Sequence, residues 1–150
     1  MSNPPAVPFA TTILVRDHCL CLHAQRAARR LARVFDEALR PSGLTNGQFS
    51  VMMALNRPTP AGLGGVASLL GMDRTTLTAA LKPLERRGWV TLTPDPADKR
   101  GRLLRLTPAG EAVLTGVVPI WQRVHAAIES RLPDGNADRL RAELISLSQP

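Results

Sequence analysis

The stretch 84-LERRGWVTLTPDPADKRGRLLRLTPAG-110 decides the fold class, because its periodicity changes twice. A helical pattern ends at Gly88, and two short β-prone runs, WVTLT and LLRLT, follow it. The segment between these runs is rich in proline, glycine and charge, which predicts a β-hairpin with a long tip. Thr107 and Pro108 then predict the start of another helix, with the threonine as its N-cap.

Two helices joined by a tight turn precede this hairpin. The run 65-GVASLLG-71 predicts a short helix that breaks at Gly71, and Asp73 can cap a longer helix that starts at residue 74 and ends at Gly88. Three leucines mark the inner face of the longer helix: Leu77, Leu81 and Leu84. Such a pair is typical of a helix-turn-helix, and the hairpin directly behind it predicts a winged helix.

Apolar periodicity predicts further helices on both sides of this unit. Residues 14–40 show one helical face, and Thr45 with Gln48 can form a capping box for a largely buried helix that ends near Asn56. Residues 58–65 are expected to be a loop. Downstream, apolar residues recur at helical spacing in two further segments, from Thr107 onward and from Asp134 to Leu147.

The predicted fold class is therefore mainly α with a small β-hairpin wing (α+β). We expect a flexible N-terminal arm over residues 1–13 and a single domain over residues 14–150. Within that domain, residues 44–107 form the winged helix. The helices of residues 14–43 and 108–150 have apolar faces wider than one such unit can cover, which indicates dimerisation in a symmetric pair.

The net charge of +7 points toward a polyanionic partner. Residues 73–107 hold eight basic and four acidic side chains, whereas residues 111–150 hold four and five. The sequence shows no signal-peptide pattern and no apolar run long enough for a membrane span. Two cysteines only two residues apart form no disulfide framework, so we expect a cytoplasmic protein.

The winged-helix pattern assigns chemistry to the longer helix. Thr75 and Thr76, near its start, can reach base edges in a major groove, because hydroxyl groups both donate and accept hydrogen bonds. Lys82 and Arg86 are better placed for phosphate contacts. The alternative is that these basic residues form an ordinary solvated face. Their proximity to the basic hairpin favours the first interpretation.

The segment quoted above closely resembles the winged-helix half of MarR-type transcriptional regulators. The residues that carry the resemblance are Arg86, Arg87 and Gly88, then Asp98 and Arg100, then Leu106, Thr107 and Gly110. The segments 44-LTNGQFSVMMAL-55 and 66-VASLLGMDRTTLT-78 are similar to the family's second helix and helix-turn-helix. The resemblance covers roughly residues 18–130 and implies that Pro83 bends the recognition helix without ending it.

The resemblance implies a homodimer that binds a palindromic operator on double-stranded DNA and is released by a ligand or by oxidation. It implies that Arg100 enters the minor groove while Asp98 holds it through a salt bridge. The expected DNA-binding residues are Arg74, Thr75, Thr76, Lys82, Arg86, Lys99 and Arg100. Ala79 and Ala80 stand where many members carry a polar reader, so few base contacts are expected.

The stretch 17-DHCLCLH-23 gathers five potential metal ligands, but one helix face supplies at most two of the four that zinc needs. We therefore expect no metal and no cofactor. The spacing of Cys21 to Thr45 resembles that of the reactive cysteine in peroxide-sensing MarR-type repressors. Those sensors support the thiolate with two tyrosines, where this chain has Phe35 and Asn46. Cys21 is a candidate redox sensor, with an inert buried cysteine as the alternative.

The other candidate signal is a small anionic or phenolic ligand. His23, Arg26 and Arg30 are the candidate pocket residues, since arginine pairs with planar anions. The same arginines also fit surface charges or contacts to the DNA backbone. From another class, a winged-helix module that binds protein is the alternative function. The sequence contains no nucleophile elbow, phosphate-binding loop or ordered triad, so no catalytic residue is expected.

Overall fold

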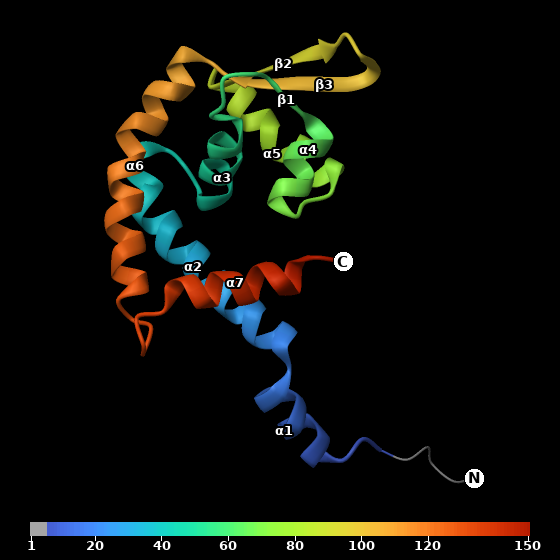
Figure 1. Cartoon of the computed structure of the whole chain (residues 1–150), viewed down its shortest axis with the longest axis vertical. Helices are drawn as coiled ribbons and strands as arrows, with labels where there is room; N and C mark the ends of the chain where they lie inside the picture. Colours follow the sequence, from blue (N-terminus) through green and yellow to red (C-terminus); the bar gives the residue numbers. More distant parts are fainter. Residues whose placement is uncertain (1–5) are drawn as a thin grey trace, which may run out of the picture. The chain divides into compact units, whose positions relative to one another are not determined.

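The structure is a computed structural model that describes residues 6–150 (Figure 1). The described residues form helices and one small antiparallel sheet, which confirms the predicted fold class. The chain divides into two compact units, residues 1–34 and residues 35–150. Each unit is described by itself below.

The first unit contains α1 (Phe9–His18) and most of α2 (Leu20–Leu39). The prediction of a flexible arm over residues 1–13 is wrong for residues 9–13, which are helical, while residues 1–5 lie outside the described part of the chain. The prolines of the expected arm all precede Phe9, and Pro8 occupies the N-cap position of α1 with an extended backbone. No proline or glycine interrupts residues 9–18, so every residue there has an amide and can adopt helical backbone angles.

The single helix predicted over residues 14–40 is also wrong, because the backbone of Cys19 is extended, with φ −72° and ψ 109°. Cys19 acts as a cap for α2, since its Sγ accepts the backbone N–H of Leu22 at 3.4 Å. Its carbonyl accepts both the backbone N–H and the ring Nδ1 of His23, at 3.1 and 2.8 Å. Asp, His and Cys are weak helix formers, so this local capping interrupts an otherwise continuous pattern.

The second unit begins with the last turn of α2 and contains most of the described elements. They are η1 (Arg40–Ser42), α3 (Asn46–Leu55), β1 (Ala61–Gly62), α4 (Leu63–Leu70), α5 (Arg74–Arg86), β2 (Val90–Asp95), β3 (Asp98–Leu106), α6 (Pro108–Glu129) and α7 (Ala137–Ser148). The antiparallel sheet has the order β1-β3-β2. β1 lies in the segment that the sequence predicts as a loop, because two residues are too few to show strand alternation.

Capping side chains begin α3, α5 and α6 where the sequence predicts. α7 instead begins at Ala137, with Asn136 as its cap, and α4 begins at Leu63 without a side-chain cap. Thr45 and Gln48 form the complete capping box of α3. Thr107 Oγ1 accepts the N–H of Gly110 at 3.1 Å and so caps α6. These contacts satisfy amides that have no carbonyl partner within their own helix.

Leucines of α5 form the centre of the core. Leu77, Leu81 and Leu84 are at most 1% exposed, as their shared helical face predicts. α5 continues past Pro83 to Arg86, and the N–H of Arg87 donates to the Pro83 carbonyl at 3.1 Å. The proline therefore does not end the helix.

The tip of the hairpin is shorter than predicted. β2 ends at Asp95 and β3 begins at Asp98, so that only Pro96 and Ala97 form the turn. Asp95 Oδ1 accepts the N–H of Ala97 at 2.9 Å and stabilises this turn. The register shifts between Pro94, which pairs with Arg102, and Asp95, which pairs with Asp98. Lys99, Arg100 and Gly101 therefore form a bulge on β3.

The junction between the sheet and α6 is closely packed. The Thr107 hydroxyl donates to the Gly88 carbonyl at 2.6 Å, and its amide donates to the Trp89 carbonyl at 3.0 Å. A Cβ on Gly110 would lie 2.2 Å from the same Trp89 oxygen. Only glycine allows α6 to start this close to the β2 backbone.

Arg87 fixes the exit of α5 from the other side. Its guanidinium donates to the Gly43 carbonyl and lies over the indole ring of Trp89, 4.8 Å from the ring centre. Gly43 has a left-handed backbone, with φ 75°, directly before α3. Arg87, the residue that follows α5, thus contacts Gly43, which lies before α3, and Trp89, which lies directly before β2.

We predict that Gly110→Ala destabilises the protein by about 1–3 kcal/mol, because the added methyl group would displace the backbone at Trp89. Urea denaturation measures the change. Gly116→Ala is the matched control on the same helix, where a Cβ meets nothing within 4 Å. We expect the control to be neutral or stabilising by up to about 1 kcal/mol, as alanine is the better helix former. Equal effects of both changes would contradict the close approach at Gly110.

We also predict that Arg87→Gln lowers the urea midpoint and changes the tryptophan emission, since the substitution removes the guanidinium from the Trp89 ring. Arg86→Gln is the control, because Arg86 is exposed and has no described side-chain partner. If both variants unfold at the same urea concentration, Arg87 has no structural role.

Candidate nucleic-acid interface

The turn between α4 and α5 places the N-terminal end of α5 at the surface. Gly71 has a left-handed backbone, with φ 64°, and its amide closes α4. Asp73 then caps α5 by accepting the backbone N–H of Thr76 at 2.7 Å. This hydrogen bond is the main cause of a lowered pKa for Asp73. The cap is therefore present in the ionised form and is lost as the pH falls through that lowered pKa.

The three residues expected to contact DNA at the start of α5 are all exposed, but they differ in their contacts. The Thr76 hydroxyl donates to Asp73 Oδ2 at 2.9 Å, so its proton is already used by the cap. The Arg74 guanidinium lies over Gly64 of α4, where a Cβ would meet its Nη2 at 2.7 Å. Thr75 has no described side-chain hydrogen bond and is the most available reader of the three.

Lys82 and Arg86 are exposed on the face of α5 opposite its buried leucines. They are four residues apart and therefore lie one turn from each other on the same stripe. Within residues 6–150, neither forms an ion pair. Both cations are thus available to an external anion.

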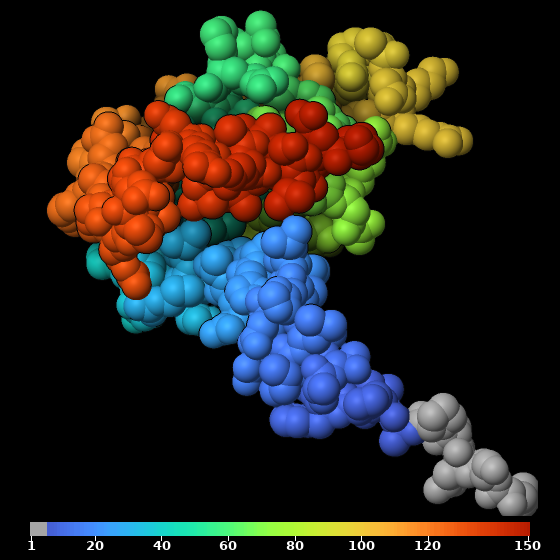
Figure 2. Space-filling model, turned by 60° about the horizontal axis from the view of Figure 1, so that its bottom comes forward, coloured from blue at the N-terminus to red at the C-terminus, as the bar shows by residue number. Residues whose placement is uncertain are grey.

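The hairpin projects from the helical part of the second unit, and its tip stands out in the space-filling view (yellow in Figure 2). Lys99 and Arg100 are exposed in the bulge near this tip. A Cβ on Gly101 would lie 3.1–3.2 Å from Asp98 and Asp95, so the bulge is crowded on its inner side. A glycine inside a strand pattern is the sequence signal that indicates such a bulge.

The expected salt bridge between Asp98 and Arg100 is not present in the described structure. Asp98 Oδ1 instead accepts the backbone N–H of Arg100 at 3.0 Å. The bulge brings this amide within reach of a carboxylate two residues earlier, and the local contact is formed in place of the ion pair. Asp98 therefore fixes the backbone from which the Arg100 side chain extends.

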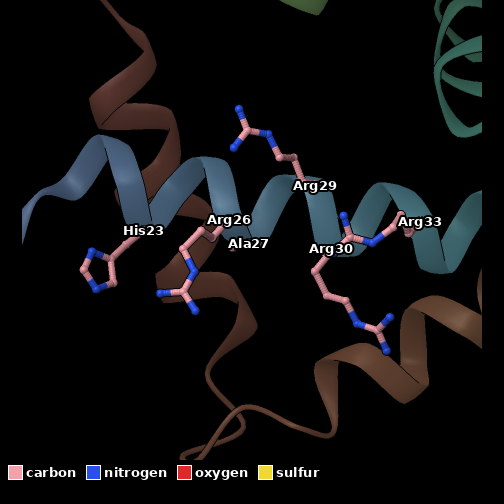
Figure 3. A pocket seen from close by; sticks show the side chains of 6 residues that line it. All are labelled: His23, Arg26, Ala27, Arg29, Arg30 and Arg33. Carbon is pink, nitrogen blue, oxygen red and sulfur yellow. The ribbon is translucent and has the colours of Figure 1, made fainter. Parts of the chain in front are cut away.

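The candidate signal residues all belong to α2 in the first unit. Cys21 is exposed, and its Sγ accepts a hydrogen bond from Gln25 Nε2 at 3.1 Å. An open hollow of about 520 Å³ is lined by His23, Arg26, Ala27, Arg29, Arg30 and Arg33 (Figure 3). It brings together the three predicted pocket residues and Arg33, which the sequence also offers as an anion partner, and it adds Arg29.

Two features are absent from residues 6–150. No group of three or more His, Cys, Asp or Glu side chains lies in an arrangement that could hold a metal ion. None of the described helices is both long enough and apolar enough to span a bilayer.

Comparison with known proteins identifies the relatives of this chain. A family model described as MarR family matches residues 44–101. The transcriptional regulator HosA of Escherichia coli O111:H- is 36% identical over 105 residues, which cover 68% of this chain and 75% of HosA. The chain spans less of two other curated relatives. It covers 52% of the length of BadR of Rhodopseudomonas palustris and 63% of the length of NicR of Pseudomonas putida.

Two solved structures share the fold over most of the chain. The M. tuberculosis transcriptional regulator MosR, solved in complex with DNA, is 36% identical with a TM-score of 0.80, and the match covers 88% of this chain and 95% of MosR. Bordetella bronchiseptica BpsR, whose DNA binding is regulated by 6-hydroxynicotinic acid, is 26% identical with a TM-score of 0.77. That match covers 88% of this chain and 100% of BpsR. The chain belongs to the MarR family, whose members are transcriptional regulators and not enzymes.

Proposed function

We propose that this protein is a sequence-specific, double-stranded DNA-binding repressor. It acts as a homodimer on a palindromic operator in the cytoplasm, and a small-molecule ligand releases it. The observation that carries the proposal is the set of exposed cations without a described anionic partner on α5 and the adjoining hairpin. A helix and a basic hairpin in sequence suit a major groove and the adjacent backbone or minor groove.

The proposed contacts follow from the local geometry. Thr75 reads a base edge, while Thr76, whose hydroxyl proton is held by Asp73, keeps only an accepting role. Lys82, Arg86 and Lys99 bind phosphates. Arg100 enters the minor groove from a backbone that Asp98 holds in place. Arg74 binds a phosphate after leaving its position over Gly64.

Exposed apolar side chains support the homodimer. On α7, Leu140, Leu144, Ile145 and Leu147 are 41–65% exposed, and on α1 Phe9 is 75% exposed. Several large apolar side chains on one helix are costly to leave in water. A second copy of the chain would cover them through a symmetric interface, which also matches the symmetry of a palindromic operator.

The names of relatives support transcriptional regulation and include both an activator and a repressor. NicR of Pseudomonas putida is named a transcriptional repressor, whereas BadR of Rhodopseudomonas palustris is named a transcriptional activatory protein. We choose repression because DNA binding that a ligand abolishes needs no contact with other proteins.

The alternative function is a winged-helix module that binds protein instead of DNA. For such a module we expect weak DNA binding that is insensitive to salt.

The deciding experiment is an anisotropy titration of the protein on DNA from its own upstream region and on random DNA, across a series of salt concentrations. We expect tighter binding to the upstream fragment and a slope of log K against log salt of about −7, from about eight phosphate contacts of Arg74, Lys82, Arg86 and Lys99 in a dimer. If no fragment binds better than random DNA, the protein is not a specific regulator.

We predict that Arg100→Ala weakens binding to the preferred fragment about thirtyfold or more, since the dimer loses two arginines and each positioned arginine in a groove contributes about 1–3 kcal/mol. Arg131→Ala is the control, because it removes the same charge from an exposed position outside α5 and the hairpin. Unchanged affinity of the Arg100 variant would exclude the hairpin from the interface.

The second candidate signal is thiol oxidation. It is favoured by the exposure of Cys21, which leaves the sulfur accessible to an oxidant, and Gln25 Nε2 donates a hydrogen bond to that sulfur. If Cys21 is the sensor, we predict that peroxide releases the wild-type protein from DNA and leaves the Cys21→Ser variant bound. Anisotropy titrations of both proteins on DNA measure this difference. Release of the variant at the same peroxide concentration would eliminate Cys21 as the sensor.

A further inference from the structure

We propose that the arginine face of α2 binds a small molecule that carries a pyrophosphate or several phosphate groups. We define this face as His23, Arg26, Arg29, Arg30 and Arg33, which line the open hollow of the first unit together with Ala27 (Figure 3). The inference rests on the proposed function, because it names the chemical class of the ligand that would release the regulator.

Helix geometry places these charges close together. At about 100° and 1.5 Å per residue, Arg26, Arg30 and Arg33 fall within an arc of roughly 60° and a length of roughly 10 Å. Figure 3 shows His23, Arg26 and Arg30 directed to the same side of α2, while Arg29 points to the other side. Arg29 donates to Gln25 Oε1 at 3.2 Å and so lies at the edge of the face.

The charges of this face are not neutralised within the described chain. Residues 1–34 contain five arginines and one acidic residue, Asp17, which pairs with Arg16. Arginines elsewhere do find acidic partners: Arg139 pairs with Glu143, and Arg141 pairs with Glu129 and Asp138. Like charges three and four residues apart repel each other on a helix, so an external anion stabilises this face.

The side chains that line the hollow favour phosphate groups over other anions. Its lining holds four guanidinium groups and one imidazole, and Ala27 is its only apolar side chain. The apolar part of the lining consists of Ala27 and the aliphatic stems of the arginines. No aromatic or large aliphatic side chain lines the hollow to pack against a phenolic or aromatic acid, whereas such side chains dominate sites for aromatic ligands. A monocarboxylate would also leave most of the positive charge unpaired. Phosphate groups accept the paired N–H donors of guanidinium, and a pyrophosphate matches several arginines at once.

Calorimetric titration of the DNA-free protein with inorganic pyrophosphate, at fixed ionic strength, tests the proposal. Orthophosphate and benzoate are the comparison anions. We expect pyrophosphate to bind at least tenfold more tightly than either anion and to raise the thermal midpoint of unfolding. Equal affinity for benzoate and pyrophosphate would overturn the proposal. ADP and coenzyme A, used next, distinguish nucleotides in general from phosphorylated thiol carriers.

The double variant Arg26→Gln/Arg30→Gln should lose at least tenfold in pyrophosphate affinity. Glutamine keeps the helix propensity of arginine, and both positions are exposed, so the fold is retained. The double variant Arg123→Gln/Arg131→Gln makes the same change in net charge at exposed positions outside α2, and we expect less than a twofold effect. Similar losses in the two double variants would show a response to net charge alone and would overturn the site.

DNA affinity of the same samples separates this inference from the proposed function. Without pyrophosphate, Arg26→Gln/Arg30→Gln should bind DNA within twofold of the charge-matched variant. Pyrophosphate should release the wild type and the charge-matched variant from DNA but leave Arg26→Gln/Arg30→Gln bound. A tenfold loss of DNA affinity, with no pyrophosphate binding by the wild type, would make this face a DNA contact and overturn the proposal. A wild type that binds pyrophosphate but no DNA would support the site and contradict the regulator.

Discussion

The contact of Gly110 with the Trp89 carbonyl is the constraint on which the second unit depends. It brings the start of α6 against the first residues of β2, and Thr107 bonds to Gly88 and Trp89 in the same place. Arg87 holds the other side of Trp89 and reaches the residues before α3. α5, the hairpin and α6 therefore share one junction, and the orientation of the hairpin follows from it.

Much of this unit is predictable from sequence because its signals are local. Caps at Thr45, Asp73 and Thr107 are short-range hydrogen bonds between neighbouring residues, and the leucines of α5 repeat at helical spacing. The features that sequence reasoning missed depend on distant or irregular backbone. β1 pairs residues more than forty positions apart in the chain. In the sequence, Arg87 resembles an ordinary surface cation, because its partner, the Gly43 carbonyl, is distant in the chain.

The candidate sites also contain features that the sequence predicts and features that it does not. The exposure of Lys82 and Arg86 follows from helix periodicity, and that of Lys99 and Arg100 follows from their place at the charged end of the hairpin. The structure agrees in both cases. The role of Asp98 was not predictable, because the choice between a guanidinium and a backbone amide depends on the bulge at Lys99 to Gly101. The break at Cys19 was hidden as well, since a sulfur cap has no distinct sequence pattern.

The two-residue turn at Pro96 and Ala97 has a consequence for the entropy of association. A long, irregular tip would lose many backbone conformations when a partner immobilises it. Here proline restricts one of the two turn residues, and the Asp95 and Asp98 carboxylates each hold a nearby amide. The backbone beneath Arg100 is thus restrained before any encounter. For the tip itself, the remaining ordering cost of association is mainly the rotamer freedom of its exposed side chains.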